Sequence, residues 1–310
     1  MIYFSFGFLS KRMSEVFNII HSHDGAADDQ MALLLLLTKH KLLATVLTPA
    51  DSRLTPAKEM CQKILALTDS IEIPLIVNDT NVPNPFPEKW RDESNEVNEL
   101  IDHNIAGIDF KIGDIKLLTD IILGSDKDII YIETGPLTTL AQCLKLNPLV
   151  EKKISKIIWT GGSFGPNGTY LPEGCDGSQT YNSYCDPYSA KVVFDTNIEI
   201  ILLTREVTEL ALLSRDLYDN LPETKYGDLY RRVYGYYIDM SFYRLWDVLT
   251  VSYIDIPEAF KQEYLKCKLV TEGTSSGRTL KDEYGREVCA VYDVNLNLFY
   301  DYVIKQMKVL

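Results

Sequence analysis

Residues 16–48 read VFNIIHSHDGAADDQMALLLLLTKHKLLATVLT and hold the pattern that decides the fold. The apolar run Val16–His23 predicts a buried strand, and the nearly uniform apolar character of Asp28–Lys39 predicts a buried helix. A second apolar run, Leu42–Thr48, predicts another strand. The order strand, helix, strand indicates two parallel strands joined by a helix that covers the sheet.

The same alternation continues along the chain. Further strands are predicted at Ile73–Val77, Ile129–Glu133, Lys156–Thr160 and Ile198–Leu203. Helices are predicted at Pro56–Leu67, Asp114–Leu123, Leu137–Leu144, Pro187–Val193, Thr224–Arg244 and Val294–Met307. We therefore expect an α/β fold, an open and mostly parallel Rossmann-like sheet flanked by helices, in a single domain over residues 1–310. Residues 1–13 are expected to be disordered or to precede a native start at Met13.

Charge and composition exclude some classes of function. The formal net charge is −13, which disfavours a nucleic-acid partner because the surface repels phosphates. The apolar run Ile2–Leu9 is too short to span a bilayer, and its flanking charges have the wrong order for a signal peptide, so we expect a cytoplasmic protein. None of the six Cys forms a C-x-x-C pair, which predicts free thiols.

Three carboxylates gather where the first strand meets the first helix. Asp24 follows the strand, a small-residue turn comes next, and Asp28 and Asp29 open the helix. Three carboxylates this close repel one another unless a cation lies among them, and oxygen ligands favour Ca²⁺ or Mg²⁺. Helix capping explains a single Asp at this place equally well. Both interpretations stay open from spacing alone.

Two other classes of enzyme begin at a similar junction. A dinucleotide-binding fold needs G-x-G-x-x-G after its first strand, and the sequence has none there. A phosphatase with an Asp nucleophile needs D-x-D, whereas Ser22 and Ala26 stand two positions before and after Asp24. Neither class fits this junction.

Five segments of the sequence match the motifs of one enzyme family. Asp24–Asp29 resembles the family's D-x-x-x-D-D signature, and Thr134–Ala141 (TGPLTTLA) resembles its T-G-P-L-T-N-[IL]-A segment. Thr160–Gly162 resembles its M-G-G turn, and Asn182–Ala190 its N-x-x-x-D-P-x-x-A stretch. Trp246-Asp247 falls where the family has its last metal carboxylate. The five segments follow the order of the inosine-uridine family of nucleoside hydrolases, and the chain resembles this family over about residues 16–300.

The resemblance implies hydrolysis of the N-glycosidic bond of a ribonucleoside with the help of Ca²⁺. Asp24, Asp29, Asp247 and the backbone carbonyl of Thr134 are its implied ligands, and the ion would hold the ribose diol and the attacking water. Asp24 is the implied general base. Since Thr134 would act through its carbonyl, its side chain carries no signal, and we expect its mutation to be uninformative. A plain strand-to-helix turn is the alternative interpretation of that segment.

Substrate contacts are implied for other residues. Asp28 and Asn182 would bind ribose hydroxyls. Asp51, which follows the second predicted strand, would lie near the ribose, unless it only caps the next helix. Trp90 and Trp246 resemble the aromatic pair of the purine-preferring branch, and would stack on a purine. An isolated Trp is otherwise more often a packing residue. That branch also implies a homodimer.

Some positions depart from the family. Thr180 stands where a Glu is expected, Thr169 where an Asn is expected, and Ala26 where a small polar residue is expected. The first two family residues grip the ribose 5′-hydroxyl. These departures leave two alternatives to a normal hydrolase: a nucleoside-binding protein with weakened turnover, or a hydrolase of a 5′-modified nucleoside.

The segment Tyr226–Tyr243 is rich in Tyr and Arg and directly precedes Trp246. We expect part of it to form a mobile lid over the site. An amphipathic surface helix is the alternative.

Overall fold

In the computed structural model, which describes residues 17–165, 168 and 172–308, ten strands of the described chain form one continuous sheet. Across the sheet the strands are β4 (Ile112–Gly113), β3 (Leu75–Val77), β2 (Leu42–Leu47), β1 (Asn18–His23), β5 (Ile129–Glu133), β6 (Ile154–Thr160), β7 (Glu199–Leu203), β10 (Arg286–Val294), β8 (Phe260–Leu269) and β9 (Thr279–Lys281). The pairs from β4 to β10 are parallel, whereas β8 and β9 add in an antiparallel manner.

The strand order reverses at the centre of the sheet. From β1 the chain builds outward through β2, β3 and β4, and then returns to place β5 on the other side of β1. Ligands of open α/β sheets bind beyond the carboxyl ends of the strands at such a reversal. Asp24, directly after β1, and Thr134, directly after β5, therefore lie where a ligand is expected.

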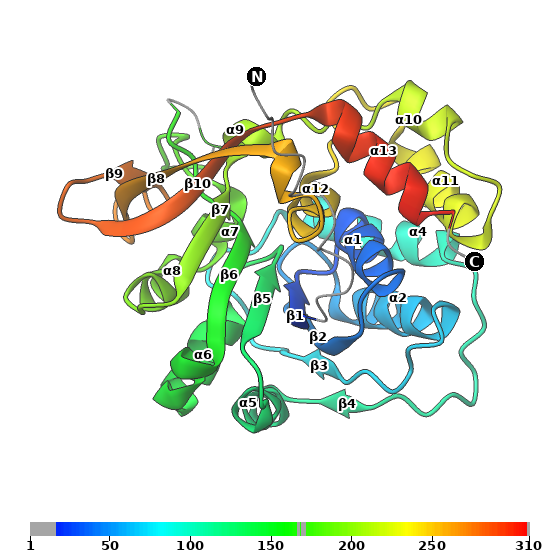
Figure 1. Cartoon of the computed structure of the whole chain (residues 1–310), viewed down its shortest axis with the longest axis horizontal. Coiled ribbons are helices and arrows are strands. Elements are labelled where there is room, and N and C mark those ends of the chain that lie inside the picture. Colours follow the sequence, from blue (N-terminus) through cyan, green and yellow to red (C-terminus); the bar gives the residue numbers. More distant parts are fainter. Residues whose placement is uncertain (1–16, 166–167, 169–171, 309–310) are drawn as a thin grey trace, which may run out of the picture.

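Helices cover both faces of the sheet (Figure 1). One face carries α1 (Ala27–Leu37), α2 (Leu54–Leu67), α11 (Lys225–Tyr237), α12 (Trp246–Ser252) and α13 (Leu296–Gln306), and the other α5 (Ile115–Gly124), α6 (Thr138–Leu146) and α8 (Pro187–Phe194). Shorter helices lie in the connections: α3 (Glu88–Arg91), α4 (Glu93–Leu100), α7 (Tyr181–Cys185), α9 (Arg205–Thr208), α10 (Arg215–Asp219), and the 3-10 turns η1 (Pro148–Lys153) and η2 (Pro257–Ala259). Alternate residues of β5 enter the two apolar cores, Ile130 on one side and Tyr131 on the other.

Helix α1 is buried on all sides. Residues 27–36 are all buried, because the helix is enclosed by the sheet and by α2, α11 and α12. A helix in this position has no solvent face and needs no polar stripe. The run of Leu residues is thus explained by burial within the protein.

The predicted fold class is confirmed: the chain forms an α/β structure with a mostly parallel sheet between helices. Two expectations differ from the structure. The helix expected at Thr224–Arg244 ends at Tyr237, and the following residues turn back so that Leu212 and Arg244 form an isolated bridge. Strands β8 and β10 were not foreseen. In β8 only Phe260, Cys267 and Leu269 are buried, so its apolar periodicity is weak.

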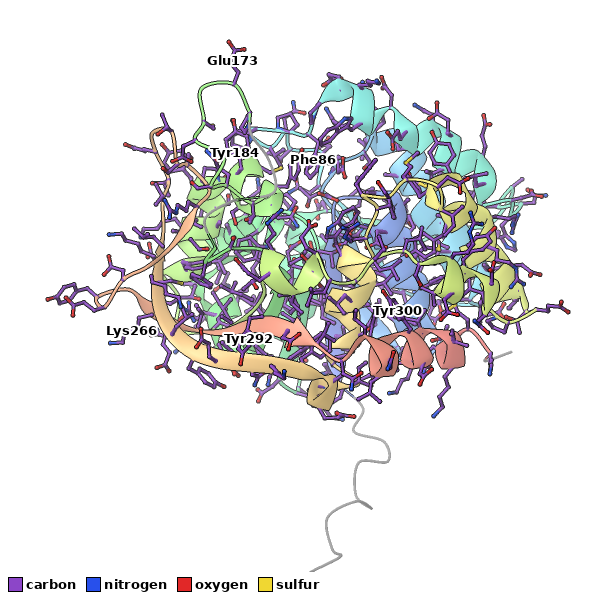
Figure 2. The ribbon with its side chains drawn as sticks, turned by 90° about the horizontal axis from the view of Figure 1, so that it is seen from above. Phe86, Glu173, Tyr184, Lys266, Tyr292 and Tyr300 are labelled. Carbon is purple, nitrogen blue, oxygen red and sulfur yellow. The ribbon has the colours of Figure 1, made fainter. Side chains whose placement is uncertain are left out.

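Figure 2, which views the molecule from above, shows β8 and β10 along one edge, with Lys266 and Tyr292 on the outside. Both side chains are exposed. Residues 1–13 lie outside the described residues. Among the residues that the structure does describe, no helix is long and apolar enough to cross a membrane. All six Cys are free thiols, as predicted.

Candidate active site

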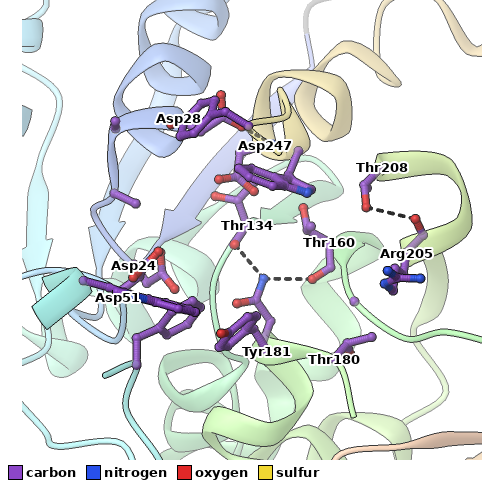
Figure 3. A pocket seen from close by; sticks show the side chains of 18 of the residues that line it. Asp24, Asp28, Asp51, Thr134, Thr160, Thr180, Tyr181, Arg205, Thr208 and Asp247 are labelled. Carbon is purple, nitrogen blue, oxygen red and sulfur yellow. Dashed lines mark hydrogen bonds between the residues drawn. The ribbon is translucent and has the colours of Figure 1, made fainter. Parts of the chain in front are cut away.

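A cavity of about 470 Å³ opens at the carboxyl ends of the central strands. Its lining includes almost every residue singled out in the sequence: Asp24, Ala26, Asp28, Asp51, Trp90, Thr134, Thr180, Asn182, Trp246 and Asp247. Figure 3 shows several of them around the same space. Asp29 lies beneath this lining, completely buried. Thr169 lies outside the described residues. The five segments of the sequence thus come together at one place.

Asp29 is the innermost of the carboxylates. One of its oxygens accepts a hydrogen bond from the Thr134 hydroxyl (2.5 Å) and the other from the Ala26 backbone N–H (2.9 Å). The second bond is part of the N-terminal cap of α1, so the capping interpretation holds for Asp29 in part. The Thr134 hydroxyl thus orients this carboxylate, a contact that the sequence did not indicate.

The buried carboxylates raise one another's pKa. Burial raises the pKa of Asp24 well above its ordinary value, and repulsion from Asp29, a hydrogen bond with Asp29, and repulsion from Asp51 and Asp247 add to it. Burial likewise raises the pKa of Asp247, followed by the charges of the neighbouring Asp side chains. A carboxylate cluster of this kind holds protons or a cation at neutral pH.

The donor set fits a hard divalent cation. Asp24, Asp29, Asp247 and the Thr134 carbonyl offer only oxygen atoms, the ligand type of Ca²⁺ and Mg²⁺. Within the described ranges no three His, Cys, Asp or Glu side chains are already arranged to hold a metal. However, repulsion from Asp29 is among the causes that raise the pKa of Asp24, and a cation between these carboxylates would relieve that repulsion.

Asp28 is held by two donors. The Tyr234 hydroxyl donates to one oxygen (2.6 Å) and the Asp247 backbone N–H to the other (2.6 Å). Burial raises the pKa of Asp28 to about 7 even though both bonds lower it. Asp28 therefore joins α1 to the start of α12, while its carboxylate borders the cavity.

Asp51 is half-buried at the cavity wall after β2. Burial raises its pKa well above the ordinary value, and the charges of Asp29 and Glu93 raise it further. The N-cap of α2 is Arg53, so the alternative that Asp51 only caps this helix is wrong.

Asn182 joins the ends of two strands. Its side-chain amide donates to the Thr134 carbonyl (2.8 Å) and to the Thr160 carbonyl (2.9 Å), as the dashed lines in Figure 3 show. Both amide hydrogens are used in this way, and the side-chain oxygen is what remains for a ligand. Because a carbonyl oxygen has two lone pairs, the Thr134 carbonyl keeps one for a cation.

Aromatic rings form two walls of the cavity. Trp90 lies 5.7 Å from the ring of Tyr181, which stacks on Phe86 at 4.2 Å. Trp246 meets Tyr243 edge-on at 5.1 Å, and Tyr243 stacks on Tyr237 at 4.0 Å. Trp90 is 42% exposed, which argues against a core packing role. Each indole is thus supported from one side by Tyr side chains.

The segment Tyr226–Tyr243 divides into two parts. Its first part, α11, is anchored, since the Tyr230 hydroxyl donates to the Met31 carbonyl and several of its side chains are buried. Its second part borders the cavity through Met240, Phe242 and Tyr243. The amphipathic-helix interpretation therefore fits α11, and a mobile lid stays a prediction for the residues after it.

Other lining residues were not foreseen from the sequence. Phe86, Tyr181, Glu93 and Arg205 all border the cavity. Tyr181 directly precedes the motif residue Asn182, and Arg205 lies just after β7. Their positions next to a motif and at a strand end were the sequence signals that could have identified them. Phe86 and Glu93 carry no such signal.

The motif order, the sheet and the site agree with one family. The model of the inosine-uridine preferring nucleoside hydrolases matches residues 19–301. The chain belongs to this family. A nucleoside hydrolase of this kind is a glycosidase, so the predicted family and enzyme class are confirmed.

Three relatives show the range of the nucleoside hydrolases. The solved structure of the inosine-uridine preferring enzyme from Bacillus anthracis has a TM-score of 0.89 and 31% identity, and covers 95% of this chain and 100% of its own. The purine-preferring ribonucleoside hydrolase from Gardnerella vaginalis, at TM-score 0.79 and 20% identity, covers 94% of this chain and 98% of its own and shares the fold.

The third relative is the pyrimidine-specific ribonucleoside hydrolase RihB of Escherichia coli. It is 24% identical over 181 residues, which span 55% of this chain and 56% of RihB. The match thus spans just over half the length of this relative. The named base preferences of the three relatives differ, so the base must be argued from the site itself.

Proposed function

We propose that this nucleoside hydrolase cleaves the N-glycosidic bond of purine ribonucleosides and uses Ca²⁺. The observation that carries the proposal is the placement of four Asp side chains and two indoles around one cavity. The carboxylates suit a cation and ribose hydroxyls, and the indoles suit a flat base. The products are ribose and the free base.

Hydrolysis of this bond passes through an oxocarbenium-like state with positive charge on the sugar. Bound Ca²⁺, held by Asp24, Asp29, Asp247 and the Thr134 carbonyl, would lower the pKa of the attacking water. Asp24 borders the cavity and would accept the proton of that water as general base. The negative charges of the buried carboxylates would stabilise the cationic sugar.

The ribose would be oriented by residues around the carboxylates. Asp28 and Asp51 border the cavity as acceptors for ribose hydroxyls, and the Asn182 side-chain oxygen is a third acceptor. Because Asp28 is already fixed by Tyr234 and the Asp247 backbone, its position is set before the substrate arrives. Such preorganisation lowers the entropy lost on binding.

Purine preference is proposed from the two indoles. A purine offers a larger stacking area than a pyrimidine, and Trp90 and Trp246 both border the cavity. We also propose, by analogy with the purine-preferring branch, a homodimer in the cytoplasm. Light scattering of the purified protein would give twice the mass of 35.3 kDa.

The test is incubation with inosine, adenosine, guanosine, uridine or cytidine and Ca²⁺, followed by a reducing-sugar assay. We expect ribose release from the purine nucleosides, its loss with a chelator, and its loss in Asp24→Asn. Ca²⁺ should also raise the melting temperature, because it binds only the folded site. The exposed variant Asp301→Asn is the control and should retain activity.

A nucleoside-binding protein without turnover is the second candidate, and Thr180 favours it because a carboxylate is missing there. The same assay separates the two. Binding of inosine without release of ribose from any of the five nucleosides would replace the hydrolase by this candidate.

The base preference has its own test. Trp90→Ala should lower kcat/KM for inosine roughly 10-fold or more and for uridine less, because truncation removes stacking worth about 1–3 kcal/mol per base. Tyr292 is about as exposed as Trp90 and does not border the cavity, so Tyr292→Ala is the matched aromatic control. An equal loss for inosine and uridine in Trp90→Ala would contradict the proposed preference.

A further inference from the structure

Arg205 lies at the end of the cavity opposite the carboxylates. It opens α9 directly after β7 and borders the cavity. Its backbone N–H donates to the Gly162 carbonyl (2.9 Å), and the Gly162 N–H donates to the Thr180 hydroxyl (3.1 Å). Figure 3 shows Arg205 and Thr180 together on one side, with Asp24 and Asp51 on the other. The two residues therefore form one end of the site.

The Arg205 guanidinium has no anionic partner in the described part of the chain. Its Nε–H group is buried and donates no hydrogen bond within the described residues. The adjacent Glu206 is engaged elsewhere, accepting bonds from the Ser163 hydroxyl and from the backbone N–H groups of Phe164 and Gly165. Glu209 pairs with Arg244. A buried guanidinium donor left unpaired in a chain of net charge −13 indicates an acceptor that arrives from outside.

The place of Arg205 identifies which part of the substrate it faces. In the proposed function the ribose diol faces the carboxylates and the base lies between the indoles. The remaining substituent of the ribose is the 5′ carbon, which then extends towards Thr180 and Arg205. At this end the chain has a cation, Arg205, and at Thr180 it lacks the carboxylate of the family pattern. Two features therefore point to a negative group on the 5′ carbon.

We propose that the substrate is a ribonucleoside 5′-monophosphate, whose phosphate is bound by Arg205 in the space beside Thr180. The Thr180 hydroxyl itself donates to Ser183. A planar guanidinium is matched to phosphate oxygens in both charge and geometry. The inference rests on the proposed function and deepens it. A cavity of about 470 Å³ falls within the range of 300–1,000 Å³ of small-molecule sites.

The charges at the two ends also orient this substrate. Arg205 attracts the phosphate, while the proposed Ca²⁺ and its carboxylate ligands take the ribose diol, so one orientation of the nucleotide suits both ends of the cavity. That orientation brings the ribose diol and the C1′ atom to the carboxylates. A neutral nucleoside receives no such guidance.

The reaction balances without a further reactant. The C1′–N9 bond of the nucleotide breaks and its electron pair leaves on the base, while the oxygen of water forms a new bond to C1′. One water proton stays on the new hydroxyl of the sugar, and the other passes through Asp24 and solvent to the base. The phosphate ester is untouched, so the products are ribose 5-phosphate and the free base.

The test compares inosine 5′-monophosphate with inosine, using the Ca²⁺-loaded protein. We expect kcat/KM for the nucleotide to exceed that for the nucleoside at least 10-fold. Arg205→Leu should lower this ratio 10-fold or more, chiefly through KM of the nucleotide. Thr180→Glu should also lower it, because it places a carboxylate beside the phosphate. Arg215→Leu, on the exposed helix α10, is the matched control and should leave the ratio unchanged.

Failure of this inference is distinct from failure of the proposed function. Hydrolysis of inosine with slower or equal hydrolysis of the nucleotide overturns the inference and leaves the function standing. If neither is hydrolysed, quenching of tryptophan fluorescence by the two compounds decides. Tighter binding of the nucleotide that is lost in Arg205→Leu supports the phosphate site, and equal binding overturns it.

Discussion

Thr134 acts in the site through both of its polar groups. Its carbonyl accepts a bond from Asn182 and is the proposed metal ligand, while its hydroxyl donates to Asp29 at 2.5 Å. A residue proposed as a ligand through its backbone thus also orients a second ligand through its side chain. Partners of this kind commonly change metal affinity 10- to 100-fold when they are removed.

The first prediction follows from this hydroxyl. Thr134→Val keeps the shape of the side chain and removes the donor to Asp29, so we expect Ca²⁺ affinity to fall about 10- to 100-fold. Calcium titration by calorimetry measures it. Thr45→Val is the matched control, because the buried Thr45 hydroxyl has no hydrogen-bond partner in the described structure and its removal should leave affinity unchanged. An equal affinity in both variants would refute the role of Thr134.

At the residue scale, the sequence indicated which residues belong to the site better than it indicated their contacts. The acidic junction and the motif order indicated Asp24, Asp28 and Asp247, and all three meet at the cavity. Arg205 was missed because one cation after a strand carries no signal until its neighbours are known. Arg205 lacks an anionic partner because the neighbouring Glu206 binds the loop at residues 163–165. This contact depends on the tertiary structure and cannot be predicted from the local sequence.

At the scale of elements, the turn after β5 packs directly on the turn after β1. A Cβ atom on Gly135 would lie 2.9 Å from the Asp24 backbone nitrogen and 3.0 Å from its Cβ. The Gly135 carbonyl also accepts a bond from the Trp159 indole (3.0 Å). The absence of a side chain at Gly135 thus allows the ends of two neighbouring strands to place their ligands together.

Gly135→Ala should therefore displace Asp24. We expect overpacking to lower the free energy of unfolding by about 1–3 kcal/mol and the nucleoside hydrolase activity to fall with it. Urea denaturation and the ribose assay measure both. Gly124→Ala, at the end of α5, meets nothing within 4 Å and should be neutral or slightly stabilising. If Gly135→Ala were as stable as the wild type, the turn would be able to accommodate a Cβ atom, and the prediction would be contradicted.

Elements with long apolar runs were predicted within a few residues, and α1 and β5 are examples. Two kinds of element were not. The helix that begins at Lys225 stops at Tyr237, because the residues after it bridge Arg244 to Leu212 instead of continuing the helix. Strand β8 was missed since mostly exposed residues give little apolar alternation, and only its pairing with β10 defines it.

At the scale of the whole molecule, Asp255 links the two ends of the described chain. It accepts hydrogen bonds from Lys39 and from His40 (3.0 Å), which follow α1, and from the Tyr302 hydroxyl (2.5 Å) of α13. Burial alone would raise the pKa of Asp255, but these bonds outweigh it and lower the pKa. The ionised form is therefore the one that the fold stabilises.

Asp255→Asn should lower the free energy of unfolding at pH 7 by about 1.5–3 kcal/mol, since hydrogen bonds to a charged group are lost. Because the folded pKa is lowered, this contribution is full above the ordinary Asp value of 3.8 and is lost as pH falls through the folded pKa. Urea denaturation between pH 7 and pH 3 measures the difference, which should shrink at the acid end. Asp301→Asn, exposed on α13, should show no such dependence. If the difference in free energy of unfolding between wild type and Asp255→Asn grew as the pH fell, the lowered pKa of Asp255 would be contradicted.

The bond between Asp28 and the Asp247 backbone also bears on how the protein is made. Its two residues are 219 positions apart, so a ribosome completes the three N-terminal carboxylates and the apolar helix behind them long before it adds their last partner. During synthesis α1 has no α12 to cover it, and the acidic cluster has no fourth carboxylate. A chain interrupted before Asp247 would expose a Leu-rich helix, which makes premature termination products of this protein strong substrates for chaperones and proteases.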